Sequence, residues 1–183
     1  APSGNAGRPN IQTYRDTTNG FELDYDGSVF MKEIKDGYIK IPPASAQKKV
    51  SQVTLVRYAS YPMSNWGTGQ KTQDQTDNPR IRLSVIPVPY ATYEAYIYET
   101  FDKGSIESAT VGGRKGIRYW MGAEGEGLAY YCVSLRSQTT LCASYNTIDE
   151  QFVRDYLTVS DFASLNQQRT LVESVLGTVR FIK

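Results

Sequence analysis

The stretch that decides the fold runs from Leu128 to Tyr145 and reads Leu-Ala-Tyr-Tyr-Cys-Val-Ser-Leu-Arg-Ser-Gln-Thr-Thr-Leu-Cys-Ala-Ser-Tyr. On both sides of Arg136-Ser137-Gln138 it is rich in tyrosine, valine, threonine and leucine, most of which favour β-strands. Two such runs around a short polar turn predict a β-hairpin. We therefore expect an antiparallel sheet to pass through this part of the chain.

Each arm of the hairpin carries one cysteine. If the turn centres on Ser137, Cys132 and Cys142 lie directly opposite each other, with their Cβ atoms within reach of a disulfide. The alternative is two free thiols buried in core strands. Because disulfides persist outside the reducing cytosol, a bridge predicts a periplasmic or other extracytoplasmic domain. A zinc site at this pair would need further soft ligands, so none is expected.

Hydrophobic patterns outside the hairpin predict more strands than helices. The expected strands are 21–25, 29–41 with a turn at Asp36-Gly37, 53–58, 81–86, a pair within 106–127 that turns at Gly112-Gly113, and 179–182. The expected helices are 92–101, 148–157, and one that begins at Ser160 or Asp161, packs through Phe162, Leu165, Val172, Val175 and Leu176, and ends at Gly177. This pattern predicts an α+β fold, a mostly antiparallel sheet covered by helices.

The 183 residues are the size of a single domain. Residues 1–10 are small and polar and include two prolines, which predicts a flexible leader before one domain over 11–183. Leaders of this kind often join envelope proteins to a lipid anchor, and the anchored cysteine would lie outside this sequence. A lipid anchor is the one membrane contact that we expect.

Composition excludes several classes of function. The net charge is +1, from 20 basic and 19 acidic residues, so we do not expect nucleic acid as a partner. The chain has no histidine, which excludes Ser-His-Asp and Cys-His catalysis and histidine-ligated zinc or iron. Carboxylate chemistry, Ser-Lys chemistry and hard metals on oxygen ligands remain open.

Short matches to functional motifs have simpler explanations. Ser45-Ala-Gln-Lys48 fits S-x-x-K, but the companion S-D-N and K-T-G motifs are absent. Asp24 to Ser28 resembles the opening of a calcium loop, but the twelfth position holds Lys35 instead of glutamate. Glycines at 112–116 and 122–127 lack phosphate-binding spacing and are expected in hairpin turns. We expect no cofactor and no enzyme activity, with a hydrolase using Glu124 and Glu126 as a lesser alternative.

Aromatic residues carry the functional prediction, because exposed tyrosine and tryptophan supply large, rigid contact area. We expect a binding surface formed by Tyr58, Tyr61, Met63, Trp66 and Tyr90. The first four enter a long loop at 61–79. Tyr90 precedes the helix that contains Tyr93, Tyr96 and Tyr98. The competing interpretation is that most of the tyrosines pack in the core. The surface would bind a protein partner, or alternatively a small ligand or glycan stacked on the same rings.

Three segments also share a pattern with a known superfamily. Tyr14-Arg-Asp-Thr-Thr-Asn-Gly-Phe-Glu-Leu-Asp-Tyr25 has a strand, a turn and G-F-x-x-x-Y; Gly112-Gly-Arg-Lys-Gly-Ile-Arg-Tyr119 has a G-G hairpin; Leu171-Val-Glu-Ser-Val-Leu-Gly-Thr-Val-Arg-Phe181 has a final helix and strand. Together these frame residues 13–182 and resemble the PsbP-like superfamily. Asp26-Gly-Ser-Val-Phe30 stands where that family commonly has Pro-x-x-Trp.

The resemblance implies an α/β/α sandwich and a non-enzymatic role. Members of the superfamily are mostly accessory and binding proteins, including bacterial envelope lipoproteins, and they share no catalytic residues. We therefore expect an extracytoplasmic binding module that recognises a protein, such as an inhibitor or immunity-type protein of the cell envelope. Fold analogy alone does not establish this function.

Overall fold

The computed structural model describes residues 10–40, 47–57, 80–123, 126–148 and 159–183. Its strands are β1 (Ile11–Asp16), β2 (Phe21–Asp26), β3 (Phe30–Lys40), β4 (Gln47–Arg57), β5 (Arg80–Ile86), β6 (Ile106–Val111), β7 (Arg114–Ala123), β8 (Glu126–Arg136), β9 (Thr139–Ile148) and β10 (Arg180–Phe181). Its helices are α2 (Tyr90–Thr100), the short 3-10 helix η1 (Lys103–Ser105) and α4 (Val159–Gly177).

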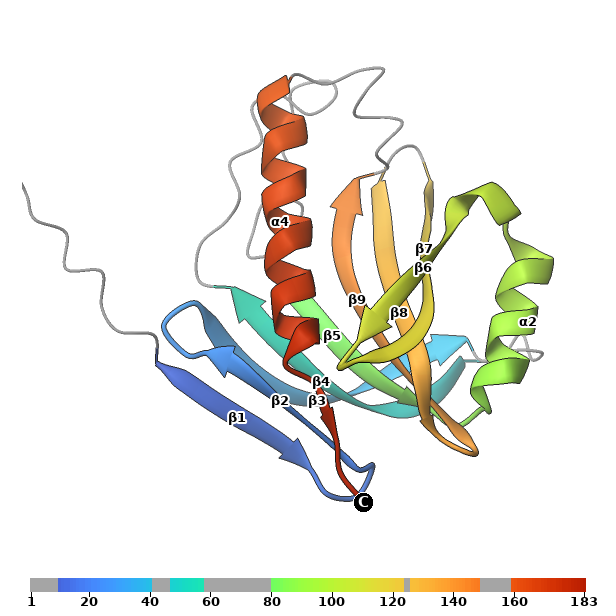
Figure 1. Ribbon diagram of the computed structural model, residues 1–183, viewed down its shortest axis with the longest axis horizontal. Helices are drawn as coiled ribbons and strands as arrows, with labels where there is room; N and C mark the ends of the chain where they lie inside the picture. The colour runs from blue at the N-terminus through green and yellow to red at the C-terminus, as the bar shows by residue number, and fades with distance from the viewer. Residues whose placement is uncertain (1–9, 41–46, 58–79, 124–125, 149–158) are drawn as a thin grey trace, which may run out of the picture.

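Seven strands form the larger sheet, in the order β3-β4-β5-β9-β8-β7-β6, and every neighbouring pair is antiparallel (Figure 1). The hairpin expected around Ser137 is confirmed as β8 and β9, which turn at Ser137 and Gln138. An irregularity in pairing between Ser134 and Arg136 moves the turn half a residue from the expected centre. Cys132 still pairs with Cys142.

The β6–β7 hairpin turns where the sequence predicted. Val111 pairs with Arg114, so Gly112 and Gly113 form a two-residue turn, and both have positive φ angles of 55° and 79°. Such a turn requires the left-handed region at both positions, which glycine adopts readily.

The turn expected at Asp36-Gly37 is wrong. Both residues lie within the continuous strand β3, where they pair with Ser51 and Val50 of β4. Val50 is buried, with 4% of its surface exposed. Pairing along the whole of β4 thus outweighs the local turn preference of an Asp-Gly pair.

A second, smaller sheet contains β1, β2 and β10. The strand predicted for 21–25 is confirmed as β2, in which Phe21, Leu23 and Tyr25 are buried and Glu22 between them is buried as well. The final strand pairs with β2 through Arg180 opposite Glu22 and Phe181 opposite Phe21. The first and last described strands therefore lie on either side of β2 (Figure 1).

The two α-helices lie on opposite faces of the larger sheet. Successive residues of β8 point to alternate faces. Tyr131 and Val133 share a core cluster with Val172 and Leu176 of α4, whereas Cys132 shares another with residues of α2. The predicted α+β class is confirmed, with a mostly antiparallel sheet, although each helix covers only part of its face.

The helix predicted for 92–101 is confirmed as α2, and the one from Ser160 to Gly177 as α4. Of the residues expected to bury α4, Leu165, Val172, Val175 and Leu176 are buried, whereas the side chain of Phe162 lies outside the described part. Most of the helix expected at 148–157 also lies outside it. No helix in the described segments is long and apolar enough to span a membrane.

Candidate functional site

The predicted disulfide joins Cys132 and Cys142. The two Cα atoms are 4.2 Å apart, the close spacing of a non-hydrogen-bonded pair in an antiparallel ladder. The cysteines are 0% and 3% exposed, in the core cluster beneath α2. The bridge is therefore a structural link between adjacent central strands and is compatible with an oxidising compartment.

The predicted binding residues are only partly placed. Tyr58, Tyr61, Met63 and Trp66 lie outside the described residues. Tyr90 is the first residue of α2 and is half-buried, and its hydroxyl donates to the Glu94 carboxylate at 2.8 Å. Burial first, and the Glu94 carboxylate second, raise the pKa of Tyr90.

Two tyrosines of the same helix are exposed instead. Tyr93 and Ile97 of α2 face the sheet and are buried. Tyr96 and Tyr98 keep 36% and 41% of their surfaces exposed. We call Tyr96, Tyr98 and the half-buried Tyr90 the α2 tyrosine surface, in which Tyr96 and Tyr98, two positions apart, point to different sides of the helix.

A buried tyrosine cluster fixes α2 to the sheet. The Tyr93 and Tyr119 hydroxyl oxygens lie 2.7 Å apart in a hydrogen bond. The Tyr119 ring stacks on the ring of Tyr130 with centroids 4.9 Å apart, and it contacts Phe101 at 5.2 Å. Desolvation by burial raises the pKa of Tyr93 to about 12, so both hydrogen-bonded hydroxyls stay protonated at neutral pH. These contacts hold α2, and with it the α2 tyrosine surface, in a fixed position on the sheet.

A polar pocket lies between α4 and the β6 edge of the sheet. Its volume is about 260 Å³, and its lining residues are Ser108, Ala109, Thr110, Arg118, Tyr131, Arg169 and Glu173. The residues come from β6, β7, β8 and α4, so the packing of the helix on the sheet creates the pocket. It lies on the face of the sheet opposite α2.

Ion pairs organise this pocket. Glu107 accepts from Arg118 and from Arg169, each at 3.1 Å, and Glu173 accepts from Arg169 at 2.9 Å and from the Tyr131 hydroxyl at 2.8 Å. Burial alone would raise the pKa of Glu173, but the Arg169 and Tyr131 hydrogen bonds outweigh it and lower that pKa. The pocket therefore combines the two guanidinium groups of Arg118 and Arg169 with the ionised carboxylate of Glu173.

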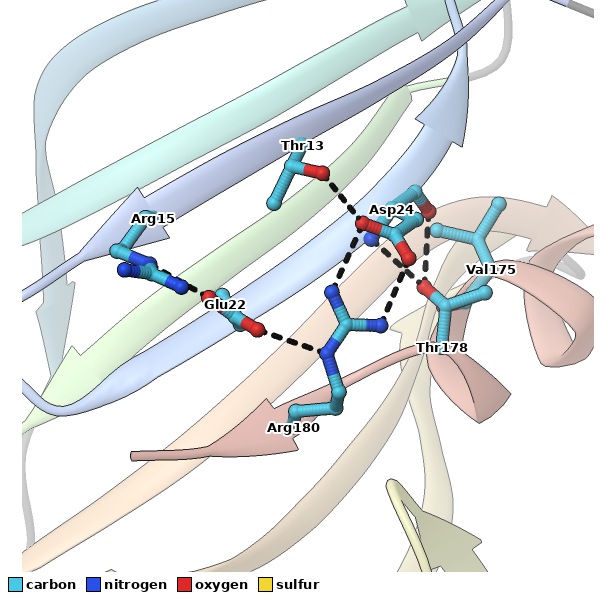
Figure 2. Close-up of polar contacts among 7 residues, drawn as sticks. All are labelled: Thr13, Arg15, Glu22, Asp24, Val175, Thr178 and Arg180. Atoms are coloured by element: carbon cyan, nitrogen blue, oxygen red, sulfur yellow. Dashed lines mark hydrogen bonds and ion pairs between the residues drawn. The ribbon is translucent and has the colours of Figure 1, made fainter. Parts of the chain in front are cut away.

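A third polar cluster joins the final strand to β2, as Figure 2 shows. Arg180 donates through Nε to Glu22 at 2.7 Å, and through both terminal nitrogens to Asp24 at 2.7 and 3.0 Å. Arg15 of β1 donates to the second Glu22 oxygen at 2.6 Å. Hydrogen bonds from Arg180 and then Arg15 lower the pKa of Glu22.

Thr178, just before β10, completes the same cluster. Its hydroxyl accepts from the Asp24 backbone amide at 3.0 Å and donates to the Asp24 carbonyl at 2.8 Å (Figure 2). Sequence reasoning missed this cluster because its members are far apart in the chain. The one signal in the sequence was the pair of acids, Glu22 and Asp24, on one face of β2. The cation that pairs with both of them, Arg180, is brought there only by the tertiary fold. These groups satisfy one another, so the cluster is a structural tether.

The alternative of a hydrolase with two catalytic carboxylates depends on residues outside the described part of the chain. Glu124 and the side chain of Glu126 lie outside them. Within the described segments, no group of three or more cysteine, aspartate or glutamate residues is arranged to hold a metal ion.

Comparisons with known proteins show likeness at the level of the fold only. No family model matches the chain, and no curated protein matches it. The solution structure of cyanobacterial PsbP from Synechocystis is similar, with a TM-score of 0.46 and 11% identity over 99% of this chain and 98% of that one. The Saccharomyces cerevisiae Ran-binding protein Mog1p is similar with a TM-score of 0.41 and 10% identity, over 96% and 97%. The resemblance to PsbP-like domains is therefore weak and carries no functional argument.

Proposed function

We propose that this domain is a non-enzymatic, extracytoplasmic binding module that recognises a protein partner, in the manner of an envelope inhibitor or accessory protein. The observation that carries the proposal is the α2 tyrosine surface, with Tyr96 and Tyr98 exposed on a helix that a buried tyrosine pair fixes to the sheet. Tyrosine and other aromatic residues are enriched in protein interfaces and among the residues that dominate binding energy.

Rigidity strengthens this interpretation. A tyrosine side chain has few rotatable bonds, and a fixed helix orders little further on binding, so less of the interaction energy is lost to entropy. Tyr61 and Trp66, in the loop that the sequence predicts at 61–79, would supply further aromatic contact area of the same kind. The buried disulfide supports an extracytoplasmic location, because such bridges persist in oxidising compartments.

Pull-down from an envelope extract, followed by reconstitution with the purified partner, tests the proposal. We expect Tyr96→Ala/Tyr98→Ala to raise the partner's Kd roughly tenfold or more, as for truncation of interface hot spots. The matched control is Thr92→Ala/Glu99→Ala, which changes two other exposed positions of α2 and should leave the Kd unchanged. Equal binding by both double variants would reject α2 as the surface.

A Tyr61→Ala/Trp66→Ala variant tests the loop separately. If this variant no longer binds the partner and the α2 variant still does, the binding surface lies on the loop. If the purified domain binds no envelope protein in any form, the protein-binding proposal itself fails.

A second candidate is a small polar ligand in the pocket beneath α4. The arrangement of Arg118, Arg169 and ionised Glu173 favours a ligand that both donates and accepts hydrogen bonds, such as a sugar or a zwitterion. The lowered pKa of Glu173 supports binding over general acid catalysis, which needs a protonated carboxyl.

A glycan array and a panel of zwitterions, followed by calorimetry, test this second function. Arg169→Gln should abolish binding of any hit. Arg136→Gln, an exposed arginine distant in sequence whose guanidinium donates to the Thr18 carbonyl, serves as the control. The absence of any hit, or equal binding by both variants, would reject the pocket as a ligand site.

A further inference from the structure

One of the two edges of the larger sheet is formed by β3, whose inner side pairs with β4; β6 forms the other edge. Among the described residues, no strand pairs with its outer side. An unpaired edge presents a row of backbone donors and acceptors that another strand can bind. The residues along this edge therefore determine what can pair with it.

Five consecutive residues at the middle of β3 have an unusual symmetry: Lys32-Glu33-Ile34-Lys35-Asp36. Ile34 is 63% exposed, the highest value among the large hydrophobic residues of the described structure. Lys32 and Glu33 precede Ile34, and Lys35 and Asp36 follow it. Residues equally far from Ile34 on its two sides therefore carry opposite charges. We propose that β3 pairs antiparallel with β3 of a second copy of this chain, about a twofold axis at Ile34.

In this register, residues whose numbers are equally far from 34 lie directly opposite each other. Ile34 meets Ile34 of the second copy, Glu33 meets Lys35, and Lys32 meets Asp36. Each ion pair occurs twice because of the symmetry. Directly opposite residues share a face of the sheet, with Cβ atoms about 4.5–5.5 Å apart, so all of these pairs are in contact distance.

Neighbouring registers lose the match. Centring the pairing on residue 33 places Glu33 opposite Glu33, and centring it on residue 35 places Lys35 opposite Lys35. Half-residue shifts place Lys32 opposite Lys35, or Glu33 opposite Asp36. Like charges directly opposite each other destabilise a strand pair. Charge therefore favours this register over its neighbours. The half-residue shifts of the axis, each of which slips the partner strand by one residue, would also turn its side chains to the wrong face.

The present contacts of these side chains do not oppose the pairing. Lys35 pairs with Glu33 of its own strand at 3.1 Å, and Asp36 pairs with Lys49 of β4. Lys32 lies 5.5 Å from the centre of the Tyr14 ring. Lys35, Lys49 and Asp36 side chains are more than half exposed, at 72%, 60% and 56%. Exposed pairs of this kind are weak, so exchanging them for pairs across the axis costs little.

Complementary charge variants test the register. E33K places two lysines opposite each other in the homodimer, and K35E places two glutamates opposite each other. Each variant should raise the dimer Kd roughly 10- to 100-fold. A mixture of the two should form a heterodimer, because lysines of one chain then meet glutamates of the other. The double variant E33K/K35E should dimerise as the unmodified chain does.

Sedimentation velocity at low ionic strength, up to about 1 mM protein, measures these equilibria. A monomer throughout that range would overturn the proposal. So would a dimer that both single variants retain, or single variants whose mixture stays monomeric. Circular dichroism of each variant shows that it is folded.

A cysteine scan locates the axis independently. The native cysteines are joined in a buried disulfide, so an added thiol has no intramolecular partner. I34C should oxidise to a covalent dimer, since residue 34 alone lies opposite itself. M31C is the control, because Met31 is also exposed, at 43%, but would lie opposite Gly37. Equal crosslinking of both variants would show random collision and reject the register.

Discussion

Replacing Cys132 and Cys142 by alanine should remove a large part of the stability of the domain. The two cysteines are 10 residues apart in sequence. In the chain-entropy account, a bridge that closes a loop of this size stabilises the native state by about 3 kcal/mol, because it restricts the unfolded chain. Both residues are buried, so loss of the sulfur atoms adds about 1 kcal/mol for the space left in the core.

Urea unfolding of the oxidised protein and the double alanine variant measures this difference. We expect the variant to lose about 4 kcal/mol in the free energy of unfolding, which corresponds to roughly 8–16 °C in Tm for a domain of this size. The variant should still fold, since the hairpin continues on both sides of the bridge from Glu126 to Ile148. Alkylation of the unfolded, unreduced protein gives the control, with neither thiol labelled.

Two outcomes would refute the reasoning. Labelling of both thiols without reductant would show that the bridge is absent. A loss below about 1 kcal/mol with the bridge intact in the parent would show that the unfolded chain is already restricted near this hairpin, so that closing the loop adds little.

Three further perturbations follow from particular contacts. Arg180→Ala should lower stability at neutral pH and reduce its acid dependence. The lowered native pKa of Glu22 contributes stability that is present above its ordinary pKa of 4.5 and lost as the pH falls through the lowered value, so urea titrations from pH 7 to pH 2 compare the two proteins. Equal pH profiles would contradict the assignment. Gly112→Ala should cost at least about 1–2 kcal/mol, because φ is 55° and the new Cβ would collide with the Val179 carbonyl oxygen; thermal melting measures it, and an unchanged Tm would reject that contact. Tyr119→Phe leaves a buried hydroxyl without its partner and should cost about 1–3 kcal/mol in urea unfolding, whereas a neutral change would show that water reaches the site.

Much of the fold could be predicted from local patterns. The hairpin with its opposed cysteines, the Gly112-Gly113 turn and α4 each depend on residues close together in the sequence, where periodicity and turn chemistry suffice. The turn expected at Asp36-Gly37 failed because the long partner strand β4 extends the pairing past it. That partner is set by tertiary structure, which a local pattern does not contain.

The candidate sites were less predictable for the same reason. A helix of closely spaced tyrosines indicates an aromatic surface, but which rings face outward depends on how α2 meets the sheet. Tyr96 is exposed, whereas Tyr93, three positions earlier, is buried against Tyr119. The pocket beneath α4 and the Arg180 cluster join residues more than 60 positions apart, such as Glu107 with Arg169 and Glu22 with Arg180. No spacing rule relates such residues before the chain is folded.

The attachment of β10 to β2 has a consequence for the order of folding. The Asp24 and Thr178 hydrogen bonds join residues 154 positions apart, whereas the β8–β9 hairpin closes within a few residues. Short-range hairpins form within microseconds, but long-range pairing must first overcome a larger loss of chain entropy. We therefore expect the large sheet to assemble while one edge of β2 is still open, and amide hydrogen exchange in refolding protein should protect β8 and β9 before Glu22 and Arg180. Until that last pairing forms, the edge of β2 is, like the outer side of β3, open to capture by another strand.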